Sequence, residues 1–151
     1  VANKLFRVYP TVNNLAGAKL KYVQKLIRSI NFYKTKSKAI INCSKILVDK
    51  YNGKPPHDFD KLIELPGVGR KTANVFLSEM GKNTIGIDTH VSYISQKLGW
   101  TKSNKPEKIE DDLKKLFPEK YWNKINPILV RFGKSYNRKK KDEILARIKN
   151  L

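Results

Sequence analysis

Apolar residues return every three or four positions along most of the chain, which is the spacing of one face of an α-helix. Pro106 suits the start of one such segment, whereas Pro127 inside another predicts a kink or a late start. No stretch sustains the alternation of a β-strand, although 84–87 is a candidate for a short extended piece. We therefore predict an all-α fold, a bundle of many short helices. The helical segments are 18–30, 35–51, 59–65, 70–80, 107–117, 121–133 and 138–151.

The length of 151 residues fits one domain, and neither an internal repeat nor a low-complexity linker divides the chain. We expect a single domain over 1–151. Cys43 is the only cysteine, which rules out an internal disulfide and a cysteine-based metal site. It falls on the apolar face of its segment, so we expect it in the core.

The charge of the chain is lopsided, with 32 Lys and Arg against 13 Asp and Glu, a net charge of +19. Such a domain usually meets a polyanion, so nucleic acid is the first candidate partner and an anionic membrane surface the second. A second explanation stays open: the protein's overall composition is rich in Lys and Asn, and the high charge reflects this composition without any polyanionic partner. No apolar run approaches the roughly 18 residues of a membrane span, and no signal peptide is visible. We expect no membrane partner and an intracellular location, in the cytoplasm or nucleoid, or in the nucleus of a eukaryote.

The stretch "ELPGVGRKTANVF" at 64–76 places two glycines just before a run of basic and small residues. It matches neither a nucleotide-triphosphate loop nor a dinucleotide fingerprint. Gly67 and Gly69 allow positive φ and the close approach of another backbone. With a helix on each side, the N–H groups of this turn form an anion site that binds phosphate without reading a base. The pattern is a helix-hairpin-helix motif at about 59–80; a glycine-rich helix connector is the plainer interpretation.

Two segments together, "LPGVGRKTANV" at 65–75 and "IGIDTHV" at 85–91, resemble the endonuclease III family of DNA base-excision glycosylases in the helix-hairpin-helix/Gly-Pro-Asp superfamily. The resemblance extends from the first residues to about 136. It implies a multi-helix bundle of the helix-hairpin-helix DNA glycosylase type. It also implies base-excision repair by a glycosylase with abasic-site lyase activity on damaged, oxidised pyrimidines in duplex DNA. We expect the protein to act as a monomer and to need no cofactor.

The resemblance maps the family's nucleophilic lysine onto Lys71 and its essential aspartate onto Asp88. A neutral lysine amine can attack the sugar carbon and form a Schiff base, and burial or neighbouring cations such as Arg70 would favour the neutral form. The carboxylate can activate the amine and stabilise positive charge on the sugar. The reaction needs the nucleotide rotated out of the stack. In the plainer interpretations, Lys71 only contacts phosphate and Asp88 only caps the helix that follows it.

Further residues are predicted to contact DNA or support these groups. His90 is expected to form hydrogen bonds near the Asp88 turn, and the aromatic residues Phe76, Tyr93, Trp100 and Trp122 are expected to pack between helices. The predicted DNA-binding residues are Leu65, Gly67, Val68, Gly69, Arg70, Thr72, His90, Lys139 and Lys140.

The chain departs from the family pattern in three places. Many members carry a four-cysteine iron–sulfur cluster near the C-terminus; here no cysteine is present there, and Asn137 stands roughly at the first ligand position. We expect no cluster, and we expect the basic helix at about 138–151 to supply some DNA contacts. From the resemblance, we also expect the printed sequence to begin after the position of the family's upstream helix and its glutamine-bearing wedge loop. Tyr93 occupies a position that is often arginine.

Two other functions stay open at this stage. The first is a non-catalytic helix-hairpin-helix module that only binds DNA, which predicts salt-dependent binding without a covalent intermediate. The second is a basic domain that binds RNA or an anionic membrane. Neither kind of binding needs the pair of Lys71 and Asp88, so this pair argues against it.

Overall fold

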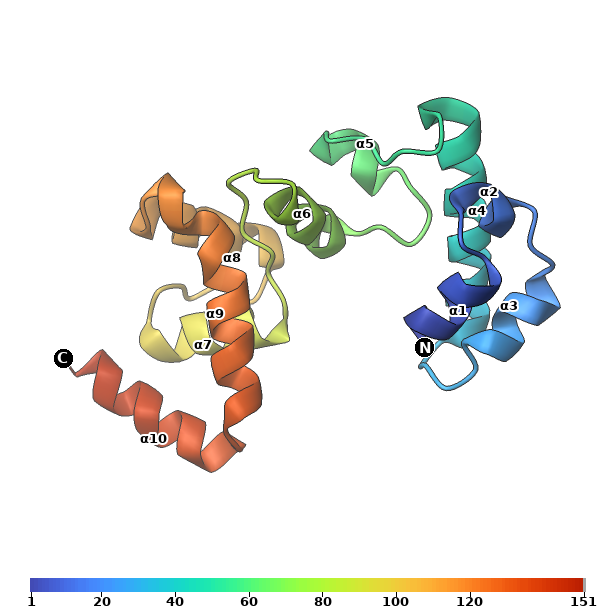
Figure 1. The fold of residues 1–151 in the computed structure, drawn as a ribbon. Helices are drawn as coiled ribbons and strands as arrows, with labels where there is room; N and C mark the ends of the chain where they lie inside the picture. Colours follow the sequence, from blue (N-terminus) through green and yellow to red (C-terminus); the bar gives the residue numbers. More distant parts are fainter. Residues whose placement is uncertain (151) are drawn as a thin grey trace. The chain divides into compact units, whose positions relative to one another are not determined.

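The structure is a computed structural model that describes residues 1–150, and its secondary-structure elements are helices joined by loops (Figure 1). No β-strand occurs within that range, so the all-α prediction is confirmed and 84–87 is not a strand. The elements are α1 (Ala2–Val8), α2 (Val12–Ala16), α3 (Leu20–Leu26), α4 (Tyr33–Tyr51), α5 (Phe59–Ile63), α6 (Arg70–Glu79), α7 (Thr89–Leu98), α8 (Pro106–Leu116), the 3-10 turn η1 (Glu119–Tyr121), α9 (Trp122–Ser135) and α10 (Arg138–Lys149).

The chain divides into two compact units, Val1–Gly69 and Arg70–Leu151. Each unit has its own cluster of buried apolar side chains. The boundary falls where α6 begins, immediately after the glycine-containing turn. The expectation of one domain over the whole chain stays a prediction. Of the helices between residues 1 and 150, none has the length and apolar content to cross a bilayer.

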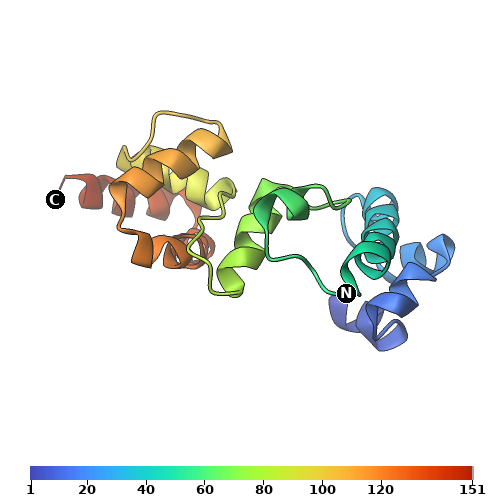
Figure 2. The same cartoon turned by 90° about the horizontal axis from the view of Figure 1, so that it is seen from above.

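In the first unit, α2 and α3 pack on the long helix α4, and α1 packs on α3 (Figure 2). The core residues are Leu5, Leu15, Val23, Ile27 and Ile41. The helix predicted over 18–30 is shorter, because the chain turns after Leu26 and Phe32 takes the left-handed conformation with φ 58° to start α4. Cys43, expected in the core, is only half-buried, and this burial raises the pKa of its thiol.

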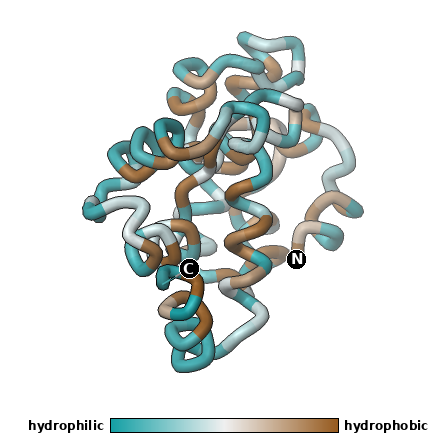
Figure 3. The backbone as a smooth tube through the Cα atoms, turned by 90° about the vertical axis from the view of Figure 1, so that its left-hand side faces the viewer, coloured by the Kyte–Doolittle hydropathy of each residue, from teal (hydrophilic) through white to brown (hydrophobic). Residues whose placement is uncertain are grey.

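In the second unit, α7 packs against α8, α9 and α10, and α6 packs against α9. The hydropathy colours of Figure 3 alternate along the helices, as one-sided burial requires. Trp100 meets Phe117 edge to face at 4.9 Å, and Trp122 Nε1 donates to the Phe117 carbonyl at 2.8 Å. The packing roles predicted for Tyr93, Trp100 and Trp122 are therefore confirmed, since all three lie against the core.

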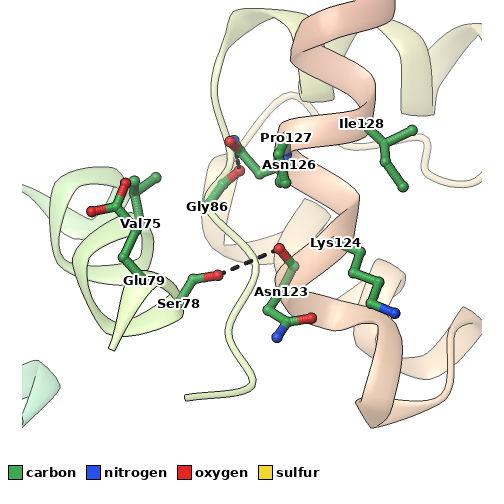
Figure 4. Close-up of a pocket in the computed structure, with 9 residues that line it drawn as sticks. All are labelled: Val75, Ser78, Glu79, Gly86, Asn123, Lys124, Asn126, Pro127 and Ile128. Atoms are coloured by element: carbon green, nitrogen blue, oxygen red, sulfur yellow. Dashed lines mark hydrogen bonds between the residues drawn. The ribbon is translucent and has the colours of Figure 1, made fainter. Parts of the chain in front are cut away.

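Helix α9 is continuous through Pro127, so the proline does not delay its start. A proline has no N–H, so the carbonyl of Asn123, four residues earlier, loses its helical donor. Ser78 Oγ of α6 donates to that carbonyl at 3.4 Å, and Asn126 Nδ2 donates to the Gly86 carbonyl at 2.6 Å. Both bonds border a cavity of about 500 Å³ between α6, Gly86 and α9 (Figure 4). The proline thus leaves an acceptor that joins α9 to α6.

Candidate reaction pocket and phosphate-binding turn

The segment Leu65–Val68 forms a tight turn that leads into α6. The Val68 N–H donates to the Leu65 carbonyl at 3.0 Å, Pro66 holds the second position, and Gly67 has φ +80°. This is the arrangement of a type II turn, which requires positive φ at its third residue. Because the Val68 N–H is used within the turn, it is not free to bind phosphate as predicted. The N–H groups of Gly67 and Gly69 are the turn's remaining candidates.

Position 67 requires glycine, whereas position 69, just after the turn, does not. A Cβ on Gly67 would lie 2.9 Å from Ala39 Cβ of α4, so both the conformation and the space demand glycine. Gly69 has no positive φ, and a Cβ there would meet nothing within 4 Å. The prediction of positive φ is right for Gly67 and wrong for Gly69. The group that approaches Gly67 closely is the side chain of Ala39, whereas another backbone was expected. The side chain of Leu65 is only 4% exposed, so it supports the turn and has no surface to offer DNA.

Replacing Gly67 with alanine is expected to destabilise the protein by about 1–3 kcal/mol, because alanine must take positive φ and push Ala39 aside. Gly69→Ala, the matched control, is expected to change stability by less than about 1 kcal/mol. Urea unfolding of both variants measures the difference. Equal losses would contradict the distinction between the two glycines.

Lys71 and Asp88 come together in the second unit, as the resemblance implies. Lys71 Nζ lies 3.8 Å from Asp88 Oδ2, and the two side chains are 56% and 11% exposed. The other oxygen, Oδ1, accepts the Val91 N–H at 2.9 Å, so Asp88 is the N-cap of α7. The carboxylate therefore holds the start of α7 with one oxygen and faces the amine with the other. The capping interpretation is confirmed, and it does not compete with a role beside Lys71.

The pair opens into a pocket of about 560 Å³, within the range of small-ligand sites. Sequence reasoning missed Ser92 and Gln96 here, although they follow Asp88 at four-residue steps on one face of α7, a signal that could have found them. Asn104 lies in the connection to α8, where no periodicity points to it. Gln96 Nε2 donates to the Ser103 carbonyl at 2.8 Å and so holds this connection against α7. The lining residues are Lys71, Ile87, Asp88, Thr89, Ser92, Tyr93, Gln96, Asn104 and Pro106.

A buried carboxylate anchors the helix that carries Lys71. Glu110 of α8 has a side chain that is 5% exposed, and it accepts from Arg70 Nη1 at 2.9 Å, Asn74 Nδ2 at 3.0 Å and Lys114 Nζ at 2.7 Å. Arg70 is thus paired with an anion, which corrects the expectation that it acts as an uncompensated cation beside Lys71. Its side chain is 46% exposed, so a phosphate contact stays a prediction.

Asn74 also connects α6 to the segment that leads to Asp88. Its Nδ2 donates to the Ile85 carbonyl at 3.2 Å, and its own carbonyl accepts from Thr84 Oγ1 at 2.6 Å. The helix bearing Lys71 and the segment bearing Asp88 are therefore joined three residues away from each functional group. This network joins the backbone segments that carry the amine and the carboxylate.

The other predicted site residues lie in different surroundings. Thr72, Lys139 and Lys140 are exposed, as a DNA contact requires. His90 is half-buried and packs on Gly133 of α9, where a Cβ would lie 2.8 Å from the His90 Cγ. Its ring therefore helps to set the approach of α7 to α9. Asn137, at the expected place of the first cluster ligand, caps α10 by accepting the Lys140 N–H at 3.0 Å.

No group of three or more His, Cys, Asp or Glu side chains within residues 1–150 is arranged to hold a metal ion. The only cysteine of the chain is Cys43.

Curated relatives match most of this chain. Endonuclease III of Thermotoga maritima is 46% identical over 134 residues, covering 88% of this chain and 63% of the relative. Endonuclease III of Bacillus subtilis is 37% identical over 138 residues, covering 89% and 62%. The chain thus spans less than two thirds of the length of these relatives.

Solved structures and a family model agree with this result. A trapped covalent intermediate of endonuclease III with DNA has a TM-score of 0.86 at 36% identity, covering 89% of this chain and 64% of that one. A thermostable thymine-DNA glycosylase has a TM-score of 0.77 at 18% identity, covering 87% and 63%, and supports the fold alone. The family model of HhH-GPD superfamily base excision DNA repair proteins matches residues 1–119. Together with the turn and the Asp-Thr-His segment, this match shows that the chain belongs to the HhH-GPD superfamily of base excision DNA repair proteins.

Proposed function

We propose that this chain is a DNA glycosylase with abasic-site lyase activity that acts in base-excision repair. The observation that carries the proposal is the amine of Lys71 at 3.8 Å from the Asp88 carboxylate, at the edge of a pocket of about 560 Å³. A nucleophilic amine beside a carboxylate is the arrangement that Schiff-base chemistry needs. The substrate would be duplex DNA with an oxidised or ring-opened pyrimidine or an abasic site, bound by a monomer.

Relatives and charge support DNA as the substrate. A solved endonuclease III structure similar to this chain holds DNA in a covalent intermediate. The net charge of +19 favours a polyanion, and the glycine turn offers backbone N–H groups to a phosphate. These features grip the backbone without reading sequence, which suits an enzyme that must act wherever damage occurs.

The proposed reaction assigns one task to each group. The neutral amine of Lys71 attacks the sugar C1′ of a flipped nucleotide, and the C1′–base bond breaks. Asp88 accepts the proton that the amine loses and stabilises the positive charge on the sugar. The base leaves with the bonding electrons and takes a proton from water. The Schiff base forms as the C1′–O4′ bond opens and O4′ takes the proton held by Asp88. The imine then allows loss of a C2′ proton and cleavage of the C3′–O bond with the 3′ phosphate as leaving group, and water hydrolyses the imine and releases Lys71.

Exposure of Lys71 bears on this reaction. Burial or neighbouring cations were expected to favour the neutral amine, yet the Lys71 side chain is 56% exposed and its nearby partner is a carboxylate. Insertion of the nucleotide into the pocket would exclude water from the amine. At 3.8 Å the pair is looser than a hydrogen bond, so the amine can turn toward C1′ at small cost.

Borohydride trapping on a duplex with one abasic site tests the proposal. We expect a covalent protein–DNA product with the unaltered chain, none with Lys71→Ala, and an undiminished product with Lys115→Ala, an exposed lysine of α8. A product that persists in Lys71→Ala would overturn Lys71 as the nucleophile. Salt-dependent binding with no trapped product would favour the non-catalytic DNA-binding module.

A further inference from the structure

Helix α10 carries a strong positive charge, with six basic and two acidic side chains among its twelve residues. Both acidic groups are already paired with lysines. Asp142 Oδ1 lies 3.3 Å from Lys97 Nζ of α7, and Glu143 Oε2 lies 3.5 Å from Lys140 Nζ. The outward side of α10 therefore presents mainly cations. Of these, Lys139, Lys140 and Arg147 are exposed.

The opposite side of α10 is docked on its own unit (Figure 1). Leu145 is 2% exposed and joins the core that includes Val91 and Ile94 of α7. Lys141 Nζ donates to the Gly133 carbonyl at the end of α9, at 2.9 Å. The position of α10 on α7 and α9 is therefore set by both apolar and polar contacts.

Tyr93 joins this docked helix to the reaction pocket. Tyr93 lines the pocket together with Lys71 and Asp88, and its hydroxyl donates to Asp142 of α10. This hydrogen bond raises the pKa of Tyr93 and lowers that of Asp142. Three cations surround the same ring: Lys97 Nζ at 5.6 Å and Arg138 and Lys141 at 5.9 Å from its centroid. The Tyr93 side chain thus lies at the pocket, donates to a carboxylate of α10, and has three cations near its ring.

We propose that α10 holds the phosphate backbone of duplex DNA next to the pocket, and that the Tyr93–Asp142 hydrogen bond sets its position. Arg138 with Lys97 would meet phosphates flanking the nucleotide in the pocket, and Lys139 with Lys140 would meet phosphates farther along. This inference rests on the proposed function, because the phosphates concerned flank a nucleotide at Lys71. It assigns Tyr93 as a positioning residue rather than a catalytic one.

Two variants and a matched control test the surface and the positioning separately. Fluorescence anisotropy would follow a labelled duplex with a stable tetrahydrofuran abasic analogue and an undamaged duplex of the same sequence. Lys139→Ala/Lys140→Ala is expected to weaken binding to both duplexes by roughly tenfold, and to lower the slope of log K against log salt by about 0.9 per lost contact. The control Lys108→Ala/Lys115→Ala removes two exposed charges from α8 and should leave most of the affinity.

Tyr93→Phe keeps the ring and removes only the hydroxyl. We expect it to reduce the preference for the abasic duplex over the undamaged one by roughly three- to tenfold, with the helical circular dichroism unchanged.

Unchanged affinity and salt slope in the double-lysine variant, or losses no larger than those of the α8 control, would overturn α10 as a DNA-binding element. An unchanged preference in Tyr93→Phe would overturn its positioning role.

The outcome is separable from that of the proposed function, because binding to the uncleavable analogue needs no nucleophile. Suppose that the α10 variant loses binding and that the unaltered chain gives no borohydride-trapped product. This result would support α10 as a DNA-binding element of a protein that binds DNA without cutting it. A trapped product that depends on Lys71, with α10 variants that bind normally, would support the lyase and refute this inference.

Discussion

Replacing Asp88 with asparagine is expected to slow strand cleavage at an abasic site by about 10²–10⁴-fold, with stability nearly unchanged. Asparagine caps a helix as well as aspartate does, so the hydrogen bond from the Val91 N–H, now 2.9 Å long, can be kept. The substitution removes the negative charge of the Asp88 carboxylate that faces Lys71 Nζ. It also removes the ability of Asp88 Oδ2 to accept a proton from the Lys71 amine. Single-turnover cleavage and thermal unfolding of the same preparation measure the two effects.

Asp88→Ala completes this test because it removes the cap together with the charge. We expect the same loss of cleavage plus about 0.5–2 kcal/mol of destabilisation. Asp111→Asn, an exposed carboxylate of α8, is the control for a change of net charge alone. If Asp88→Asn cleaved at the unaltered rate, Asp88 would be a helix cap only, and the assignment of the carboxylate to the chemistry would be wrong.

Replacing Glu110 with alanine is expected to lower the free energy of unfolding by about 2–3 kcal/mol. The change removes a buried carboxylate and the three hydrogen bonds that Arg70, Asn74 and Lys114 donate to it. Breaking a fully buried ion pair costs roughly 3–5 kcal/mol, and the loss is smaller here because Arg70 and Lys114 can reach water. Urea unfolding measures the loss.

The position of Glu110 on α8 offers a direct comparison. Asp111, the next residue, is exposed, so Asp111→Ala is expected to stay within about 0.5 kcal/mol of the unaltered protein. Glu110→Ala should also misplace Lys71, because Asn74 and Arg70 lie on the helix that carries it. A variant that lost stability yet kept full cleavage would show that the network holds the fold without setting the distance between amine and carboxylate.

Features that depend only on neighbouring residues can be predicted from the sequence. Helical periodicity predicts an all-α chain. The cap formed by Asp88, the plainer interpretation of that residue, could be anticipated because a cap binds N–H groups only a few residues away. The dipeptide Pro66-Gly67 predicts a turn, in which Gly67 takes a φ of +80° that only glycine adopts readily. The paired segments at 65–75 and 85–91 identified the family, since they hold two functional groups in one pattern.

The contacts of those groups, in contrast, depend on how the helices pack. Glu110 meets Arg70 across 40 positions, and Tyr93 meets Asp142 across 49, and neither pairing leaves a local signal. The sequence alone therefore indicates Arg70 as a cation beside Lys71, Tyr93 as a packing residue, and the Val68 N–H as a phosphate ligand, although the turn itself uses that N–H. Local hydrogen bonds and periodicity act over about one helical turn, whereas contacts between α6, α7, α8 and α10 depend on how whole helices pack. That packing sets the 3.8 Å between Lys71 and Asp88, and with it the chemistry we propose.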